Sequence, residues 1–469
     1  MTQLSISLDR GKKIPLASQI YLTIRAAIES GQIPANAKLP SWRDLAVQLG
    51  VSRGTVRLAY ERLIDEQLAL GLGAAGTRVT ERRSTAPVSP WSVEAPPMPD
   101  LFHDFGSTPL PFQMGVPAQD AFPAALWSRI LAQEAKRSAA GPVGYPDPRG
   151  DPALRKEVAA YLGIARGLRC SPSQVLITAG FSGALNLAIR GLGLEGGQAW
   201  MEEPGFPLTR TALGLAGMRA VAVPVDDEGL DVAAGARLAP GATLAVVTPG
   251  QQAPLGMTMS LSRRLALLEW AQHNGGWIVE DDYLSELQLE GRAAPALASL
   301  DQDGRVLHIG TFSKTISPAL RLGFLVVPPM LVRRFGDLMA CLAPAPAGMV
   351  QAAVAVFMQD GHYLRHLRRM KRLYAARRAA LLQGLRDEVA GAIEVQATAG
   401  MAVVARLHGA ASDVEIAVRA RRLGLAPTPL SPWYEQPPRR QGLLLGVTNV
   451  GVERIAEDCR RLAGLARPA

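Results

Sequence analysis

The pattern of apolar and polar positions predicts an N-terminal unit of short helices followed by a hairpin. Apolar residues recur at helical spacing in three consecutive segments, each bounded by residues that begin or end helices. The predicted helices cover residues 16–30, 42–49 and 53–67. Two short apolar segments follow at 68–70 and 77–80, separated by the glycine-rich LGLGAAG. Because apolar segments flank a flexible turn, they predict a small β-hairpin, or wing.

The pattern changes once along the chain. Residues 84–101 are rich in Pro, Ser and Ala with almost no periodicity, which predicts an extended linker. From 102 to 469, short apolar strands alternate with amphipathic helices, as in a layered α/β domain with a mostly parallel sheet. We therefore expect an N-terminal domain over 1–83 and a C-terminal domain over 102–469. The latter is expected to divide into a large subdomain at about 130–345 and a small one at about 346–469.

Composition narrows the class of protein. A chain of 469 residues exceeds the size of one typical core, which agrees with more than one domain. The apolar segments are too short to span a bilayer and no signal-peptide pattern precedes them, so we expect a cytoplasmic protein without membrane contact. The 3 cysteines and 6 histidines show neither pairing nor ligand spacing, so no disulfide and no bound metal is expected.

The charge is unevenly distributed. The net charge is +9, and residues 1–83 contain 12 Lys and Arg against 7 Asp and Glu. A small basic domain suits a polyanion such as DNA. Charge alone leaves nucleic-acid binding and a generally Arg-rich composition equally open.

The second and third predicted helices have the spacing of a helix-turn-helix. They are joined by the tight turn LGVS, and the third begins SRGTVR. Arg53, Thr55 and Arg57 lie in its first turns, from which a recognition helix reaches base edges. A single exposed Arg would more often be an ordinary helix start, but three helices with a wing favour DNA binding. The opposite face is predicted to be core, through Val56, Ala59, Tyr60 and Leu63.

The segment GTFSK carries the strongest chemical signal of the C-terminal region. Lys314 follows an apolar strand at 306–309, and Thr311 and Arg321 are close in sequence. A lysine buried at a strand end keeps its amine neutral and can form an imine, while hydroxyl and guanidinium groups can hold a phosphate. Alone this signal is weak, because a lysine after a strand is usually a surface residue.

A carboxylate and a phenol follow another apolar strand. Asp281 and Tyr283 belong to EDDY, directly after the predicted strand 277–279. Such a carboxylate can keep a pyridine nitrogen protonated, and the phenol can donate to a ring oxygen. On local evidence a solvated acidic loop is the commoner explanation for EDDY.

Two further segments suit a phosphate and a flat ring. The helix predicted to start at GFSG can present the backbone N–H groups of Gly180, Phe181 and Ser182 to a phosphate. Phe206 follows a Pro-Gly turn in EEPGFP, where it could stack on a ring. An ordinary strand–helix turn and a core phenylalanine are the respective alternatives.

The N-terminal segment resembles the DNA-binding domain of the GntR family. The residues that carry the resemblance are PLASQIYLTIRAAIESGQI, LPSWRDLAVQLGVSRGTVRLAYERLIDEQL and GTRV at the end of the wing. Trp42 departs from the family pattern, in which a small polar residue is commoner. The resemblance implies DNA contacts by Arg43, Arg53, Thr55, Arg57, Gly76 and Thr77.

From about residue 102 to 465 the chain resembles a class I aminotransferase of fold type I, which binds pyridoxal 5′-phosphate (PLP). The order of segments carries the resemblance: GYPDPRG, ITAGFSGALNLA, EEPGFP, EDDY, then GTFSK followed by Arg321. With the GntR-like segment, the chain is identified as a member of the MocR subfamily of GntR regulators. The expected fold class is multi-domain, with an N-terminal winged helix-turn-helix and an α/β fold type I aminotransferase domain.

The resemblance implies roles in a PLP site formed at the interface of a head-to-tail homodimer. Lys314 would form the imine with the cofactor, Asp281 would pair with the pyridine nitrogen, and Tyr283 would approach the ring oxygen. Phe206 would stack on the ring, and Tyr145 would reach the phosphate bound by the partner subunit. The remaining phosphate contacts would come from Thr311, Arg321, Gly180, Phe181 and Ser182.

Two positions depart from the aminotransferase pattern. Ala253 stands in TPGQQAPLG where aminotransferases carry an Asn that contacts the cofactor, and Leu444 stands about where an Arg would bind a substrate carboxylate. A buried carboxylate without a partner would be costly. Either another Arg serves, such as Arg210 or the pair Arg439 and Arg440, or the ligand is not an ordinary α-amino acid.

These features predict a PLP-binding transcription regulator rather than an enzyme, leaving room for a residual transamination half-reaction. Operator DNA, PLP and a small amine effector are the expected partners, and ligand binding at Lys314 would shift the conformation of the dimer. Control of vitamin B6 synthesis is the first expectation for its biology, and control of amino-acid or amine utilisation the second. A working aminotransferase with a DNA-binding appendage is the alternative. A regulator that has lost PLP is disfavoured, because Lys314, Asp281 and Arg321 are all present.

Overall fold

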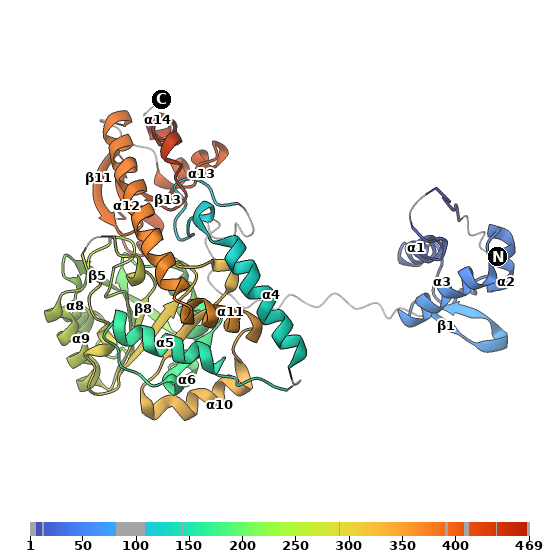
Figure 1. Cartoon of the computed structure of the whole chain (residues 1–469), viewed down its shortest axis with the longest axis horizontal. Helices are drawn as coiled ribbons and strands as arrows, with labels where there is room; N and C mark the ends of the chain where they lie inside the picture. Colours follow the sequence, from blue (N-terminus) through green and yellow to red (C-terminus); the bar gives the residue numbers. More distant parts are fainter. Residues whose placement is uncertain are drawn as a thin grey trace. The chain divides into compact units, whose positions relative to one another are not determined.

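The chain forms two compact units, each with its own core. The computed structural model describes residues 6–466 except 12–13, 81–107, 142–143, 290, 390–392, 408–411 and 438. The units are Met1–Val93 and Glu94–Ala469 (Figure 1). The predicted linker at 84–101 lies outside the described residues.

The first unit combines helices with one small antiparallel sheet. Between residues 14 and 80 its elements are α1 (Leu16–Glu29), α2 (Trp42–Leu49), α3 (Arg53–Asp65), β1 (Ala69–Gly71) and β2 (Thr77–Val79). The helix predicted over 53–67 ends earlier, because Glu66 leaves the helical conformation and Gln67 has a φ of 56°. The first strand of the wing, β1, therefore begins one residue later than the predicted 68–70.

Each helix of this unit buries one face, and α2 and α3 begin at serine caps. Ser41 Oγ accepts a hydrogen bond from Asp44 N, and Ser52 Oγ accepts one from Thr55 N. Gly50 ends α2 with a φ of 62°, a conformation that favours glycine. The predicted core face of α3 is confirmed, because all of its members are buried against α1 and α2: Val56, Ala59, Tyr60 and Leu63.

The second unit is built around a large, mostly parallel sheet, as the alternation of strands and helices predicts. In the described part of the chain the strand order is β3-β10-β9-β8-β7-β4-β5-β6. β10 and β6 run in the direction opposite to the other strands of this sheet. The strands are β3 (Val175–Thr178), β4 (Gln198–Glu203), β5 (Arg219–Asp226), β6 (Gly229–Leu230), β7 (Leu244–Val247), β8 (Trp277–Asp282), β9 (Val306–Thr311) and β10 (Gly323–Val326).

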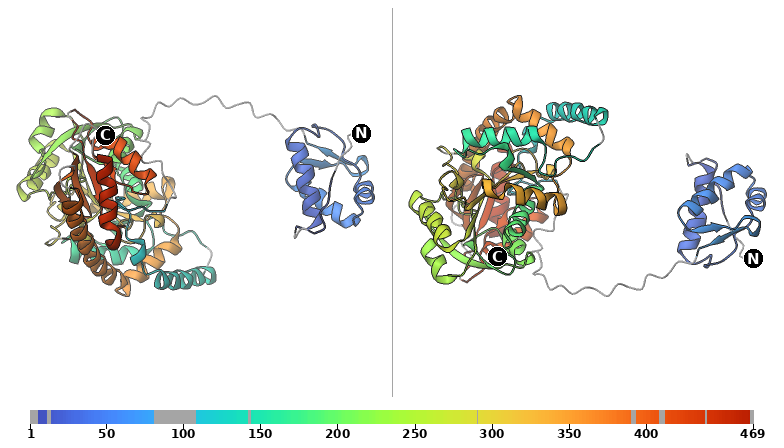
Figure 2. Two further views of the ribbon diagram at one scale, coloured as in Figure 1. Left: turned by 90° about the horizontal axis from the view of Figure 1, so that it is seen from above. Right: turned by 90° about the horizontal axis from the view of Figure 1, so that it is seen from below.

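Helices cover both faces of this sheet (Figure 2). Successive residues of β3 face opposite cores: Leu176 packs with α6 and α10, whereas Ile177 packs with α5 and α11. On the same face as Ile177, α8 and α9 cover Trp200 of β4. The helices are α4 (Ala124–Ala140), α5 (Pro152–Ala165), α6 (Gly180–Leu192), α7 (Pro207–Leu215), α8 (Val232–Leu238), α9 (Leu261–Asn274), α10 (Val332–Leu342) and α11 (Gly348–Gln359).

A smaller antiparallel sheet with order β11-β12-β14-β13 forms the other end of the second unit. Its strands are β11 (Ile393–Ala399), β12 (Ala402–Leu407), β13 (Thr428–Pro429) and β14 (Leu443–Gly446), and the long α12 (His362–Glu388), α13 (Asp413–Arg422) and α14 (Ile455–Ala466) pack on it. Figure 1 shows α12 running from α11 to this sheet. Among the described residues, no helix has the length and apolarity needed to cross a membrane.

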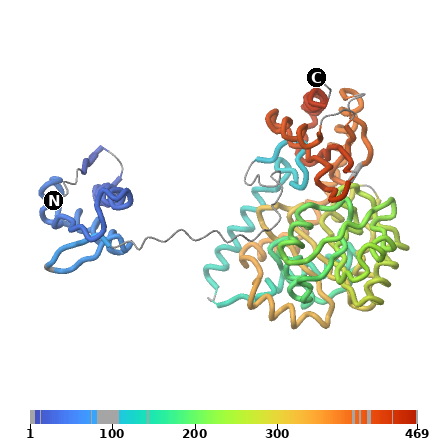
Figure 3. The backbone as a smooth tube through the Cα atoms, turned by 180° about the vertical axis from the view of Figure 1, so that it is seen from behind, coloured from blue at the N-terminus to red at the C-terminus, as the bar shows by residue number. Residues whose placement is uncertain are grey.

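A strap at residues 112–118 lies beside the small sheet, where Figure 3 shows the start of the second unit next to the C-terminal strands. Gly446 N donates to Phe112 O at 2.8 Å, and Thr448 Oγ1 donates to Val116 O at 2.5 Å. Ala118 N donates a hydrogen bond to the Tyr374 hydroxyl oxygen of α12 at 2.9 Å. The strap is therefore fixed to the small sheet and to α12.

Replacing Ser52 with Ala should weaken the start of α3. Ser52 Oγ accepts from Thr55 N at 3.2 Å, and loss of such a cap costs about 1 kcal/mol. Hydrogen exchange of the α3 amides should therefore become about fivefold faster, while α6 keeps its wild-type rate. Unchanged protection of α3 would show that the cap does not hold this helix.

Candidate functional site

The predicted cofactor residues meet at the carboxyl ends of the parallel strands of the large sheet. Asp281 is near the end of β8, Lys314 follows β9, Phe206 follows β4, and Gly180 begins α6 after β3. This edge of an open α/β sheet is where ligands bind, because the strand-to-helix connections there leave a crevice.

Lys314 and Asp281 lie close enough to affect each other's ionisation. Burial lowers the pKa of Lys314, and the Asp281 carboxylate opposes that shift. Burial raises the pKa of Asp281 to about 8, and repulsion from Asp282 and Glu202 adds to the effect. In the described part of the chain, the Asp281 carboxyl group makes neither a hydrogen bond nor an ion pair. Its carboxyl group therefore suits an added cation such as a protonated ring nitrogen.

The lysine is held by a residue that the sequence reasoning missed. Lys314 Nζ donates to Gly115 O at 2.9 Å. Gly115 has a φ of 77°, and a Cβ at this position would lie 2.7 Å from Lys314 Nζ. The positive φ favours glycine here, and a side chain would displace the lysine amine from this position. The sole sequence signal was one glycine in MGVP.

Tyr283 and Phe206 approach the site from two loops. Burial is the main cause that raises the pKa of Tyr283, so its phenol stays protonated and can donate a hydrogen bond. The Phe206 ring lies 5.5 Å from the Trp433 ring, centroid to centroid, at an interplanar angle of 42°. Trp433 is a second aromatic neighbour that the sequence did not single out.

The predicted phosphate residues also converge. Gly180 begins α6 with a φ of 73°, and a Cβ there would lie 3.9 Å from Arg321 Nη2. Arg321 is exposed and has no ion-pair partner among the described residues. Thr311 Oγ1 accepts from Ser313 N at 3.1 Å. A helix start, a free guanidinium and hydroxyl groups suit a phosphate dianion. The side chain of Ser182 is exposed beside this helix start, whereas Phe181 packs into the core.

Tyr145 lies before α5 and shows no described contact with the other predicted cofactor residues. Its side chain is fully exposed. A role at the partner subunit remains a prediction.

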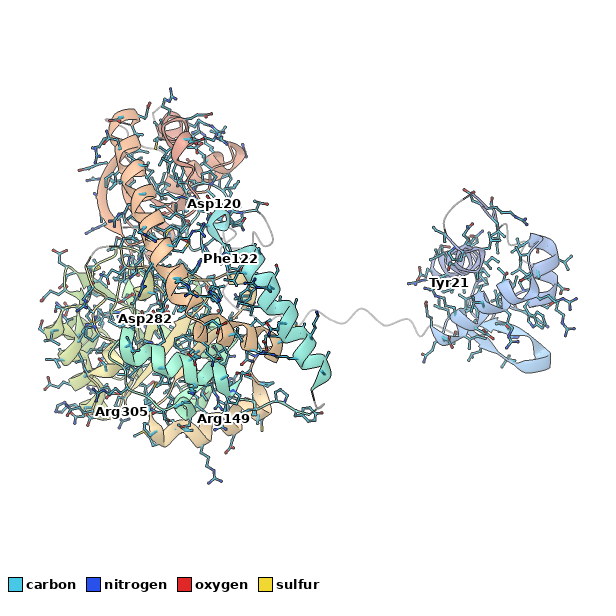
Figure 4. All side chains as sticks on the ribbon, in the orientation of Figure 1. Tyr21, Asp120, Phe122, Arg149, Asp282 and Arg305 are labelled. Atoms are coloured by element: carbon cyan, nitrogen blue, oxygen red, sulfur yellow. The ribbon has the colours of Figure 1, made fainter. Side chains whose placement is uncertain are left out.

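The acidic segment EDDY is part of a buried strand and not a solvated loop. The strand predicted over 277–279 continues to Asp282. Asp282, labelled in Figure 4, accepts a hydrogen bond from Arg166 Nε at 2.7 Å, and Glu280 Oε2 lies 3.0 Å from His308 Nδ1. Because side chains alternate along a strand, these pairs hold one face of β8 while Asp281 projects from the other.

Arg53 is the most available cation on the recognition helix. It is exposed and has no partner among the described residues. Arg57 forms an ion pair with Glu61 at 2.8 Å on the exposed surface. Thr55 Oγ1 lies 2.8 Å from Ser52 Oγ at the helix start.

The helix before it and the wing present further candidates. The Arg43 guanidinium lies 4.9 Å from the centroid of the Trp42 ring, so the unusual Trp42 packs against a predicted DNA contact. Gly76 has a φ of 93°, and a Cβ there would lie 2.9 Å from Lys38 Cε. Lys38 forms a β-bridge with Arg78, next to Thr77. Lys38 and Arg78 are exposed cations that sequence reasoning missed.

The two departures from the aminotransferase pattern share one apolar cluster. Ala253 and Leu444 are both buried in it. Arg210 is already engaged by two carboxylates, with Nη2 3.4 Å from Glu203 Oε2 and Nε 3.4 Å from Glu435 Oε2. The other proposed cations, Arg439 and Arg440, are exposed.

Comparison with known proteins agrees with this architecture. Residues 16–79 match the family described as bacterial regulatory proteins, gntR family, and residues 116–433 match aminotransferase class I and II. The chain is 36% identical to the probable rhizopine catabolism regulatory protein MocR of Rhizobium meliloti, over 97% of this chain and 94% of the relative. It is 30% identical to the pyridoxine biosynthesis transcriptional regulator PdxR of Corynebacterium glutamicum, over 82% of each chain.

The second unit is similar to solved aminotransferases. An archaeal alanine:glyoxylate aminotransferase superimposes with a TM-score of 0.69 at 26% identity, over 77% of this chain and 91% of that one. The Pyrococcus horikoshii kynurenine aminotransferase, solved in complex with PMP, gives a TM-score of 0.68 at 25% identity with the same coverage.

Fold and site together define a PLP-binding transcription regulator, with a winged helix-turn-helix and an aminotransferase-type unit. The chain belongs to the MocR subfamily of the GntR family of bacterial regulators. The predictions of fold class, family, regulatory function and PLP as cofactor are confirmed.

Ionisation of Asp281 should destabilise the cofactor-free protein as the pH rises. Its pKa is about 8 in the folded chain against an ordinary 3.8, so between these values the folded state keeps a proton that the unfolded state has released. The stability that this proton provides is full below about pH 4 and is lost as the pH rises through about 8, by up to about 1.4 kcal/mol per pH unit.

Asp281→Asn should therefore gain stability relative to wild type between about pH 5 and pH 8. Urea unfolding of the cofactor-free protein measures this difference. The exposed Asp337 provides the control, because Asp337→Asn should follow wild type at every pH. Parallel curves for Asp281→Asn and wild type would contradict the assigned burial.

Proposed function

We propose that this chain binds PLP through Lys314 and that an amine ligand at that site changes the DNA binding of its dimer. The main support is the meeting of Lys314 with the unpaired Asp281 at the carboxyl edge of the large sheet. The free Arg321 beside the start of α6 adds a place for the phosphate.

The residues around the lysine would orient the cofactor. Asp281 would keep the ring nitrogen protonated, Tyr283 would donate to the ring oxygen, and Phe206 would lie against the ring face. When bound, PLP supplies an electrophilic carbon that captures primary amines reversibly. The phosphate would be held by Arg321, Thr311 and the backbone of Gly180, Phe181 and Ser182.

We place this site in a head-to-tail homodimer in the cytoplasm. The fully exposed Tyr145 supports this arrangement, because it would be free to reach the phosphate bound by the partner subunit. A symmetric dimer also carries two DNA-binding units, which suits an operator with two half-sites. Each recognition helix would contact bases through Arg53, Thr55 and Arg57. The sugar-phosphate backbone of the DNA would be contacted by Arg43, Gly76 and Thr77.

Sensing is favoured over enzymatic turnover by the composition of the site. Ala253 and Leu444 replace polar groups that an aminotransferase would use, and both are buried among apolar side chains. Two pathways are supported by relatives: one is named for pyridoxine biosynthesis and the other for rhizopine catabolism. Vitamin B6 synthesis is our first candidate, and use of an amine compound is the second.

Lys314→Ala should abolish covalent cofactor binding. The wild-type chain incubated with PLP should absorb near about 420 nm, as expected for a lysine–PLP imine. The exposed Lys156 of α5 gives the matched control, since Lys156→Ala should keep the band. A band that persists in Lys314→Ala, or its absence from wild type, would overturn the proposal.

Arg53→Ala should weaken specific DNA binding by about 10- to 100-fold, the loss expected for one base contact. Fluorescence anisotropy with a duplex selected from random sequence by the wild-type protein measures the effect. Arg190→Ala, an exposed position of α6, should bind like wild type. Wild-type affinity of Arg53→Ala for the selected duplex would exclude Arg53 from base recognition.

A further inference from the structure

We propose that the amine ligand of this site carries no carboxylate next to its amino group and presents an apolar group in its place. The inference rests on the proposed function, because it requires an amine ligand at Lys314. It concerns only which ligand tail the protein accepts.

An apolar wall borders the cofactor residues. Its members come from β12, β14, the turns near them and the loop after β7, and all are buried: Ala253, Val404, Leu430, Trp433, Tyr434 and Leu444. Met114, Phe206 and Tyr283 pack against this wall. Two of the proposed cofactor contacts, Phe206 and Tyr283, therefore share a surface with Leu444.

The wall also reaches the reactive lysine. Lys314 Nζ donates to Gly115 O at 2.9 Å, and the preceding Met114 packs on the wall. Gly446, at the end of the strand that carries Leu444, donates to Phe112 O at 2.8 Å. A ligand amine at Lys314 would therefore have its substituents next to the wall.

Among the described residues near the wall, no buried cation is free to neutralise a ligand carboxylate. Arg210 is engaged by Glu203 and Glu435 and also donates to Trp433 O at 3.1 Å. Arg377 is buried and donates to Thr448 O and Asp120.

The other charged groups near the wall are exposed arginines, or carboxyl groups that would repel a ligand carboxylate. Arg439 is exposed and donates to Glu435 O at 3.1 Å. Arg440 is exposed and lies near Tyr434. Its charge partly offsets the rise that burial causes in the pKa of the Tyr434 hydroxyl. Two carboxyl groups also lie at the site: the buried Glu202, which accepts from Gln252 Nε2 next to Ala253, and the half-buried Asp281. A ligand carboxylate would thus lose its water without gaining a partner.

The wall suits an aromatic or aliphatic tail. The rings of Phe206 and Trp433, 5.5 Å apart, offer faces on which a flat or branched apolar group can pack. Trp433 Nε1 is buried and donates to no described group, so a neutral acceptor in the tail is compatible with the wall. The ligand class is therefore primary amines with a neutral, mainly apolar tail.

Matched pairs that differ only in the carboxylate test this inference. We would titrate the PLP-loaded full chain with 2-phenylethylamine against L-phenylalanine and with 3-methylbutylamine against L-leucine. Absorbance near the 420 nm band and calorimetry both report binding. We expect each amine to bind at least about 100-fold more tightly than its amino acid, the penalty for one unpaired buried charge.

Leu444→Arg supplies a cation at the wall and should narrow or reverse this preference. Leu444→Met keeps the wall apolar and should retain the preference for amines, as should Arg440→Ala. If Leu444→Arg no longer takes up PLP, the wild-type pairs still decide the question.

Failure of the proposed function and failure of this ligand preference give different results. Absence of the 420 nm band from wild type would overturn the proposed function itself. A normal band with tighter binding of the amino acids, or with no response to any of the four compounds, would overturn this inference and leave PLP binding at Lys314 intact. A large increase of the amine preference in Arg440→Ala would also overturn it, because the rim cation would then be a partner of the ligand carboxylate.

Discussion

The burial of the Asp281 carboxyl group opposite Lys314 is the constraint around which the site is built. A carboxylate taken out of water must gain a partner or keep its proton, since the low-dielectric interior penalises its charge. On the neighbouring positions of β8 this requirement is met internally, with His308 beside Glu280 and Arg166 bonded to Asp282. Asp281 alone has no described partner. The protonated ring nitrogen of the cofactor would supply one, so folding and cofactor binding are linked.

The strands around Asp281 provide a rigid frame for that interaction. The backbones of β9, β10 and the start of α6 approach closely through glycines. A Cβ at Gly310 would lie 2.1 Å from the Phe324 ring, and one at Gly323 would lie 3.0 Å from Gly180 Cα. Close packing of this kind leaves little freedom, so the ends of β8 and β9 keep Asp281 and Lys314 in register while the helices bury the rest of the sheet.

A ligand at Lys314 would contact both sheets of the second unit. Asp281 belongs to the large sheet and Lys314 follows one of its strands, whereas Val404 and Leu444 of the wall belong to the small sheet. A ligand can shift a conformational equilibrium only by binding two states with different affinity. Contacts that bridge two packed layers satisfy this requirement, because a small change in their separation changes the fit of the ligand tail. This arrangement suits a sensor whose output is a change of conformation.

The sequence by itself determined the local structure and the order of chemical groups. Periodicity and the residues that bound each segment predicted the three N-terminal helices and the core face of α3, because these properties depend on neighbouring residues. PLP at Lys314 was predicted from the resemblance of the segment order to a class I aminotransferase. Tertiary packing alone decided the rest. Arg166 and Asp282 are 116 positions apart, Gly115 meets Lys314 across 199 positions, and Arg210 meets Glu435 across the turn at Trp433. Only the folded backbone brings such groups within hydrogen-bonding distance, so no pattern along the chain could indicate that Asp281 lacks a partner or that Arg210 already has two.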